Sequence, residues 1–115
     1  MVIAVGEHIL GEVPETLIRA ACPFGGGLGG SKEELCGVLS GGTLILGAMR
    51  GRLSPKEKDD ALYALIRRFR ERFIAQVGAS QCKAIYNNLP EMHKRCVPVV
   101  ECGTRILLEL MEENL

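Results

Sequence analysis

Residues 24–51 read FGGGLGGSKEELCGVLSGGTLILGAMRG, and this stretch decides which fold the chain can adopt. Five of its first seven residues are glycine, which is too many for a regular helix or strand, so we predict a loop there. Ser31 and Glu34 have the spacing of a capping box, which predicts a helix from Ser31 to about Arg50. Gly51 follows as the expected left-handed residue at the end of that helix.

The helix expected over residues 31–50 has four glycines inside it, namely Gly37, Gly41, Gly42 and Gly47. Each interior glycine costs about 1 kcal/mol relative to alanine, so other contacts must compensate. Gly37 and Gly41 are four residues apart and flatten one face of the helix, which favours close approach of another backbone. We therefore predict that this is the central, buried helix of the fold.

The remaining sequence also has helical patterns, without the alternation typical of strands. Five further helices are expected, at residues 2–10, at 17–22, at 54–77, around Cys82, and at 97–112. The clearest start is Ser54-Pro55-Lys56-Glu57, an N-cap serine followed by proline and glutamate at favourable positions, and Gly78 is expected to end that helix. The sequence thus predicts an all-α fold, a compact bundle of five to six helices around the central glycine-rich helix, in a single domain over residues 1–115.

The composition and charge exclude several classes of partner. The 14 basic residues balance 14 acidic ones, so no general attraction to nucleic acid or to an anionic membrane is expected. The arginines of residues 67–72 lie beside an apolar stripe, as charges on a solvated helix face do, and no nucleic-acid partner is predicted. No apolar run reaches the roughly 18 residues of a membrane span, and the start does not resemble a secretory signal. We therefore expect a cytoplasmic protein with no membrane partner.

The chain has five cysteines, Cys22, Cys36, Cys82, Cys96 and Cys102. An odd number cannot pair completely within one chain, and cytoplasmic thiols are normally kept reduced. Clustered cysteines in such a compartment point to metal binding or redox chemistry more often than to structural disulfides. The alternative for any one of them is a small buried apolar residue. No CxxC pair is present, so a metal site would have to be assembled from distant positions.

The glycine loop and Cys36 form the first candidate site. In the expected helix Cys36 lies in the second turn, somewhat deep for the full stabilisation that a helix N-terminus gives a thiolate. Successive backbone N–H groups of a glycine-rich loop can also form a concavity that binds a phosphate or the sulfides of a cluster. The predicted cofactor-binding residues are Gly25, Gly26, Gly27 and Gly37. The loop lacks the spacing of a nucleotide-binding P-loop.

Residues 24–51 also resemble the glycine loop and the Cys-Gly helix of a family of redox-active proteins named for its cysteine pattern, C_GCAxxG_C_C. The Cys-Gly-Ala-x-x-Gly element of the family falls on residues 36–41, with Val38 in place of the small third residue. The two later cysteines of the family fall on Cys82 and Cys96, the latter within a similar Lys-Arg-Cys-Val-Pro stretch. The resemblance covers nearly the whole chain and implies that Cys36, Cys82 and Cys96 are the catalytic, redox-active set.

One cysteine of the family has no counterpart here. In the family an early helix carries the first of four cysteines just before a segment resembling residues 2–7, where this sequence opens with Met1. Either the start is truncated relative to the family, or Cys22 or Cys102 supplies the fourth sulfur. Cys22 lies beside the glycine loop and is the better substitute, whereas Cys102 is on a helical stripe typical of core.

The resemblance also suggests a metal site. A related domain in certain multihaem cytochromes is associated with an iron–sulfur centre, so the implied cofactor is an iron–sulfur cluster or another thiolate-bound metal. Its implied ligands are Cys22, Cys36, Cys82 and Cys96.

Two functions remain open from the sequence. The first is a thiol-based redox protein, an oxidoreductase or an electron-transfer protein with a redox partner, whose cysteines cycle between thiol and disulfide or ligate a metal. The second is a non-catalytic helical module in which the thiols are inert. A homodimer packed through glycine-rich helices is the expected assembly.

Overall fold

The computed structural model describes residues 2–94 and 96–113. Its helices are α1 (Val2–Leu10), α2 (Glu15–Ala21), α3 (Gly37–Arg50), α4 (Asp60–Val77), α5 (Cys82–Asn87) and α6 (Val97–Glu113), with the 3-10 turns η1 (Cys22–Phe24) and η2 (Glu91–His93). The described residues contain no strand, and extended pairing is limited to an isolated bridge between Leu35 and Gln81. The prediction of an all-α bundle is confirmed.

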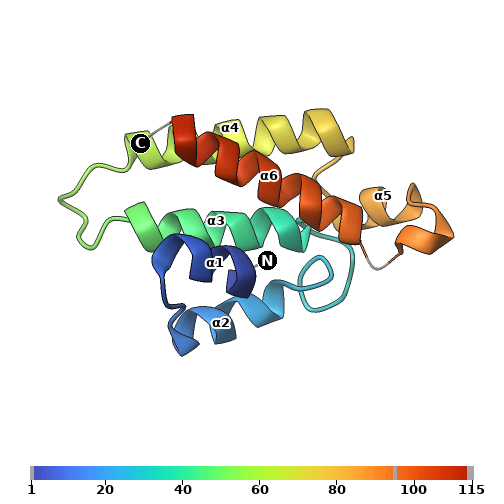
Figure 1. Cartoon of the computed structure of the whole chain (residues 1–115), viewed down its shortest axis with the longest axis horizontal. Coiled ribbons are helices and arrows are strands. Elements are labelled where there is room, and N and C mark those ends of the chain that lie inside the picture. The colour runs from blue at the N-terminus through green and yellow to red at the C-terminus, as the bar shows by residue number, and fades with distance from the viewer. Residues whose placement is uncertain (1, 95, 114–115) are drawn as a thin grey trace.

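Helix α3 lies at the centre of the bundle, with α4 and α6 on one side and α1 and α2 on the other (Figure 1). The most deeply buried side chains come from α3, α4 and α6, namely Ile45, Leu46, Phe69, Phe73, Ile106, Leu107 and Leu110. Their spacings of three and four place them on one face of each helix, where they form a common core. Helix α5 and the glycine loop lie at the end of the bundle where α3 and α6 begin.

A glycine of α6 lets this helix approach α3 closely. A Cβ placed on Gly103 would lie 2.1 Å from Val38 Cγ1, far inside contact distance. In α3, by contrast, a Cβ on Gly47 would meet no atom within 4 Å, and one on Gly37 would lie 3.6 Å from the Phe24 carbonyl oxygen. The backbone that approaches Gly37 is therefore that of the glycine loop, and the tight helix contact of α3 is made opposite Gly103.

Helix α3 begins at Gly37, later than the capping-box spacing predicts. The Ser31 hydroxyl makes hydrogen bonds of 2.8 and 3.2 Å within the loop and closes a turn there instead of capping a helix. Lys32 has a φ of 63°, which a right-handed helix does not allow. Residues 32–36 instead run alongside residues 80–83 and bond to them. The prediction of a helix from Ser31 was wrong because this tertiary pairing competes with the local cap.

Helix α4 begins at Asp60 and not at Ser54. Local hydrogen bonds do form near Ser54, where the Lys56 N–H donates to the Ser54 hydroxyl (3.2 Å). The Glu57 carboxylate, however, accepts from the Leu53 N–H (2.7 Å) and not from the Ser54 N–H as a capping box requires. The turn does not continue as a helix, because no side chain of residues 53–59 packs against the core, and Leu53 is almost fully exposed. The prediction of a helix that starts at Ser54 was therefore wrong, and the hydrogen bonds there close only a local turn.

The helix ends agree with the sequence predictions better than the helix starts do. Helix α1 spans the expected residues, and α6 extends slightly beyond the expected range of 97–112. Gly78 ends α4 with a φ of 103°, the left-handed conformation expected there. Gly51 after α3 is extended, with a φ of −63°, so its prediction was wrong. The chain leaves α3 in an extended direction toward the loop before α4.

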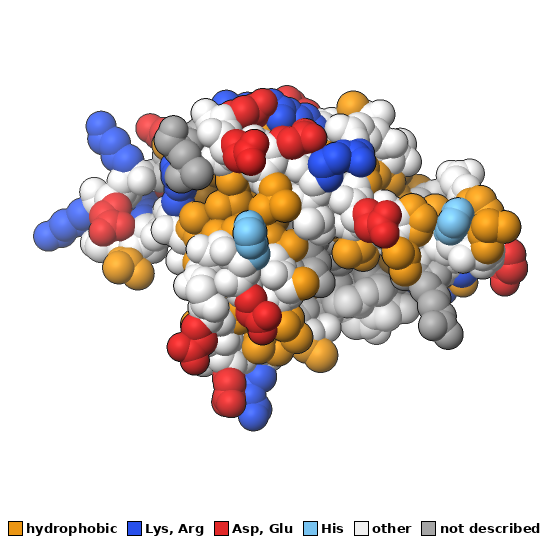
Figure 2. Space-filling model, in the orientation of Figure 1, with side chains coloured by type: hydrophobic (Ala, Val, Ile, Leu, Met, Phe, Trp, Pro, Cys, Tyr) orange, Lys and Arg blue, Asp and Glu red, His pale blue; other side chains and the backbone are white. Residues whose placement is uncertain are grey.

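The surface carries no large region of one charge on the face shown in Figure 2, where acidic and basic side chains are interspersed. Within the arginine-rich stretch of residues 67–72, Phe69 is fully buried and Arg72 pairs with Glu113 (2.8 Å). This is the arrangement of a solvated helix face, as expected. Among the described helices, none combines the length and the apolar character that a membrane crossing requires.

Candidate functional site

The glycine loop contains a run of left-handed residues. Residues 26–30 all have φ between 59° and 75°, a conformation that costs glycine little. Leu28 is the one residue of this run that is not glycine, and its side chain is half-exposed. The N–H groups of Leu28, Gly29 and Gly30 donate to the carbonyls of residues 23–25. The loop is thus held together by its own backbone hydrogen bonds. These three N–H groups are therefore not available to bind a phosphate or a cluster.

Backbone hydrogen bonds join the residues after the loop to the start of α5. The pairs, with the N–H donor first, are Lys83 to Lys32 (2.7 Å), Cys82 to Glu34 (2.8 Å) and Cys36 to Ser80 (2.8 Å). Because both partners of each bond are fixed to helices or to the loop, this pairing holds Cys82 near Cys36.

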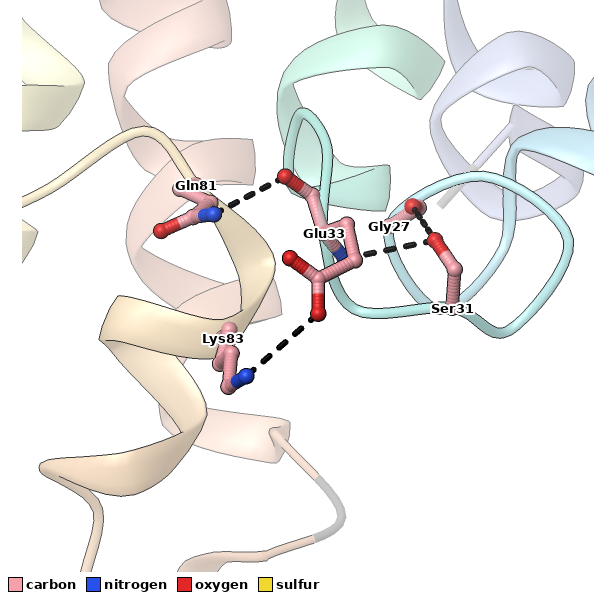
Figure 3. A network of polar contacts seen from close by, with 5 residues as sticks. All are labelled: Gly27, Ser31, Glu33, Gln81 and Lys83. Carbon is pink, nitrogen blue, oxygen red and sulfur yellow. Dashed lines mark hydrogen bonds and ion pairs between the residues drawn. The ribbon is translucent and has the colours of Figure 1, made fainter.

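Side chains reinforce the same junction (Figure 3). The Gln81 side-chain amide donates to the Glu33 carbonyl (2.9 Å), and the Lys83 ammonium pairs with the Glu33 carboxylate (3.3 Å). On the loop side, the Ser31 hydroxyl donates to the Gly27 carbonyl (2.8 Å). The glycine loop and α5 therefore act as one unit that closes over the start of α3.

Cys36 is the residue at the N-cap of α3, and its side chain is only 7% exposed. Burial raises the pKa of the Cys36 thiol, and the backbone N–H groups of Val38 and Leu39 act in the opposite direction. The nearby thiols of Cys82 and Cys96 raise the pKa further by charge repulsion. Cys36 thus lies closer to the helix N-terminus than predicted. The rise in pKa caused by burial is nevertheless larger than the fall caused by the N–H groups of the helix, so burial favours the protonated thiol.

Cys82 is the first residue of α5 and is partly exposed. Burial raises its pKa most, Cys96 raises it further, and the ammonium of Lys32 lowers it. Gly27 leaves the space that Cys82 needs, since a Cβ on Gly27 would lie 2.5 Å from the Cys82 Cβ. The left-handed loop therefore packs directly on this cysteine.

Cys96 precedes α6 and has a φ of 63°, which is rare for a residue other than glycine. Its N–H donates to the His93 carbonyl (2.8 Å), and its sulfur lies 3.9 Å from the Lys94 carbonyl oxygen. Arg95, part of the Lys-Arg-Cys-Val-Pro stretch, lies outside the described residues. The structure thus brings Cys36, Cys82 and Cys96 together at the start of three helices.

The other two cysteines lie elsewhere. Cys22 is exposed in η1 and lines a cavity of about 380 Å³ with apolar residues of α1, α2 and α3. Cys102 is on α6, where its sulfur lies 3.4 Å from the Gln76 side-chain oxygen. Neither of them is among the thiols that shift the pKa of Cys36 or of Cys82. The expected role of Cys22 as a fourth sulfur of the same site therefore has no support in this arrangement.

The metal centre that the resemblance implies has no support among the described residues. Over residues 2–94 and 96–113, no group of three or more His, Cys, Asp or Glu side chains is placed to hold a metal ion. No combination of Cys22, Cys36, Cys82 and Cys96 meets that condition. The ligand set Cys22, Cys36, Cys82 and Cys96 and the cofactor-binding role of Gly25, Gly26, Gly27 and Gly37 stay predictions.

A cluster of charged and aromatic side chains beside Cys82 was missed from the sequence. The ammonium groups of Lys32 and Lys94 lie 3.9 and 4.2 Å from the centre of the Tyr86 ring. Lys32 reaches this ring because of its positive φ and its backbone bond to Lys83. No local motif marks these residues, since they come from three segments that only the tertiary structure brings together.

The raised pKa of Cys36 makes stability depend on pH. The pKa lies above its ordinary value of 9.0, so the folded protein holds this proton more tightly than the unfolded chain. That contribution to stability is fully present below the ordinary pKa. It is lost as the pH rises toward the folded pKa, by up to about 1.4 kcal/mol per pH unit. We expect the free energy of unfolding of the reduced protein, from urea titrations, to fall as the pH rises above 9.0.

The variant Cys36→Ala should lose this part of the slope. Cys102→Ala, which removes a thiol outside the cluster, should keep the slope of the wild type. Equal slopes in Cys36→Ala and the wild type would contradict the assignment to Cys36.

Comparison with known proteins adds one finding. The model of the family described as "Putative redox-active protein (C_GCAxxG_C_C)" matches residues 1–110. No curated protein matches the chain, and no solved structure does so either. Since the family model covers nearly the entire sequence, including the glycine loop and all three clustered cysteines, this chain belongs to the C_GCAxxG_C_C family of redox-active proteins.

Proposed function

We propose that this protein carries out thiol–disulfide exchange, with Cys36, Cys82 and Cys96 as its redox-active set. The observation that carries the proposal is the pairing of residues 32–36 with residues 80–83, which holds Cys82 near Cys36 although the two are distant in sequence. Charge repulsion from Cys96 contributes to the raised pKa of both thiols, which supports the same grouping. Thiols that lie close together in a partly buried site can form a disulfide with little movement of the backbone. Membership of a redox-active family supports the same chemistry.

Cys82 is the attacking thiol in this proposal. It is partly exposed, whereas Cys36 is buried. Burial and Cys96 raise the pKa of Cys82, and the ammonium of Lys32 offsets part of that rise in favour of the thiolate. The Cys82 thiolate attacks one sulfur of a substrate disulfide, which forms a mixed disulfide and releases the other half as a thiolate. A second cysteine of the set loses its proton to solvent and attacks the Cys82 sulfur. This releases the second half, so two protein thiols are oxidised and the substrate disulfide is reduced to two thiols.

The proposed reaction needs only the thiols, and the described residues include no group placed to hold a metal ion. The redox partner protein, the homodimer and the cytoplasmic location stay predictions. The competing function, a helical module with inert thiols, makes the opposite prediction about reactivity, so one experiment separates the two.

Disulfide mapping after mild oxidation tests the proposal. The reduced protein is treated with bis(2-hydroxyethyl) disulfide, free thiols are alkylated, and peptides are analysed by mass spectrometry. We expect a disulfide within the set of Cys36, Cys82 and Cys96, with Cys102 left as a free thiol. Cys82→Ser should lower the rate of oxidation of the native protein at least about tenfold.

The matched control is Cys102→Ser, which removes a thiol on α6 away from the cluster and should leave the rate unchanged. If oxidation of the folded protein joins no two members of the set, the thiols are inert and the helical module is the better description.

A further inference from the structure

Two lysines converge on one aromatic ring beside the thiol cluster. Lys32 comes from the segment after the glycine loop, Tyr86 from α5, and Lys94 from the residues after η2. The two ammonium groups lie 3.9 and 4.2 Å from the same ring centre, so they are within about 8 Å of each other. The Lys94 ammonium also donates to the Tyr86 backbone carbonyl. Two like charges are thus held near one another by the fold.

These charges have no acidic partner in the described part of the chain. Ion pairs there join other residues, and the neighbouring Glu33 is paired with Lys83 (3.3 Å). Lys32 and Lys94 are both only partly exposed. Two partly buried cations that repel each other are favoured when an anion lies between or beside them, because the anion replaces lost hydration and offsets the repulsion.

The cluster lies next to Cys82. Tyr86 follows Cys82 by four residues on α5, so both side chains lie on the same side of the helix. The backbone of Lys32 also lies close to Cys82. A Cβ built on Gly27 would be 2.5 Å from the Cys82 Cβ and 2.8 Å from the Lys32 Cα, so these two atoms flank the same point. An anion held by the two ammonium groups would therefore have its neighbouring atoms within reach of the Cys82 sulfur.

We propose that Lys32, Tyr86 and Lys94 form a binding site for the carboxylates of a small anionic disulfide, which places its sulfur–sulfur bond beside Cys82. This inference rests on the proposed thiol–disulfide exchange and names the substrate class of the same site. The charges select the substrate by its carboxylates, and the reaction at sulfur is the exchange described above. A disulfide without charge reacts at Cys82 but gains nothing from the lysines.

The test compares an anionic with a neutral disulfide. Rate constants for reaction of reduced protein are measured with glutathione disulfide and with bis(2-hydroxyethyl) disulfide, with the modified cysteine identified by mass spectrometry. Lys94→Gln and Lys32→Gln should each lower the rate with glutathione disulfide about fivefold relative to the rate with the neutral probe. The ratio of the two rates cancels any change in the thiolate fraction of Cys82. High salt should reduce the same ratio in the wild type.

The matched control is Lys58→Gln, which removes an exposed lysine in the loop before α4 and should leave the ratio within about twofold of the wild type. If neither lysine substitution changes the ratio of the rate with glutathione disulfide to the rate with the neutral disulfide, the proposed anion site is overturned. In that case, reaction of the neutral disulfide at Cys82 would still support the proposed exchange.

A second measurement keeps the two proposals separable. S-methylglutathione carries the carboxylates but has no disulfide, and its binding can be followed by calorimetry. If neither disulfide reacts but S-methylglutathione binds to the wild type and not to Lys94→Gln, the anion site is supported and the proposed exchange fails. If nothing reacts and nothing binds, both are overturned.

Discussion

Replacing Gly103 with alanine is expected to destabilise the protein by about 2 kcal/mol or more, although alanine is the better helix former. The added Cβ would lie 2.1 Å from Val38 Cγ1 and 3.7 Å from a ring carbon of Phe73. Val38 is buried, and a β-branched side chain in a helix has one strongly preferred rotamer, so it cannot turn away. Helices α3 and α6 would have to move apart, which loosens their common core. The free energy of unfolding from urea titration measures the effect.

Two further variants separate the steric clash from helix propensity. Gly47→Ala adds the same methyl group inside α3, where no atom lies within 4 Å, and should stabilise the protein by about 1 kcal/mol. In a Val38→Ala background, Gly103→Ala should cost little because the clashing methyl group is gone. The two substitutions should therefore be coupled by about 2 kcal/mol. Purely additive effects would show that Val38 and Gly103 do not pack against each other.

Gly27→Ala is expected to destabilise the protein by about 3 kcal/mol and to change the reactivity of Cys82. Gly27 has a φ of 71°, and an added Cβ would lie 2.5 Å from the Cys82 Cβ and 2.8 Å from the Lys32 Cα. The second of these atoms is backbone, so relief requires movement of the loop or of α5. Either movement displaces Cys82 from the other two thiols.

Gly29→Ala is the matched control for this substitution. Gly29 has a similar φ of 59°, but no atom lies within 4 Å of its Cβ position. Its cost should be the conformational one alone, about 1–2 kcal/mol. The rate of Cys82 with bis(2-hydroxyethyl) disulfide should change several-fold in Gly27→Ala and stay within about twofold in Gly29→Ala. If the two variants behave alike, packing of the loop on Cys82 is not what positions the thiol.

The extent of the helices could be predicted where an apolar stripe supplied the signal. The stripe of α4 with Phe69 and Phe73, and that of α6 with Ile106 and Leu110, are buried as their spacing indicates. The starts at Ser31 and Ser54 were misplaced because a capping pattern reports only local hydrogen bonds. After Ser31 the backbone pairs with residues 80–83, which lie far along the chain. After Ser54, residues 55–59 place no side chain in the apolar core.

The candidate site could be predicted only in part. The resemblance named Cys36, Cys82 and Cys96. The Cys96 thiol lies near enough to the other two to raise their pKa, but the redox role of the three stays a prediction. The cluster of Lys32 with Tyr86 had no signal, because the left-handed backbone that directs Lys32 depends on hydrogen bonds to residues distant in sequence. The pKa of Cys36 could not be read from its helix position either, because burial opposes the helix and is set by the surrounding fold.

The cysteines, the glycine-rich loop and the helical periods were determined by the sequence itself, because residue type and spacing act over one or two turns of chain. The tertiary structure decided where α3 begins, which thiols lie near one another, and which of them is buried. Those properties depend on contacts between distant segments, above all the pairing of residues 32–36 with residues 80–83. Burial and long-range hydrogen bonds exist only once the chain has closed on itself, and for that reason the short-range pattern around Cys36 could identify the thiol but not its environment.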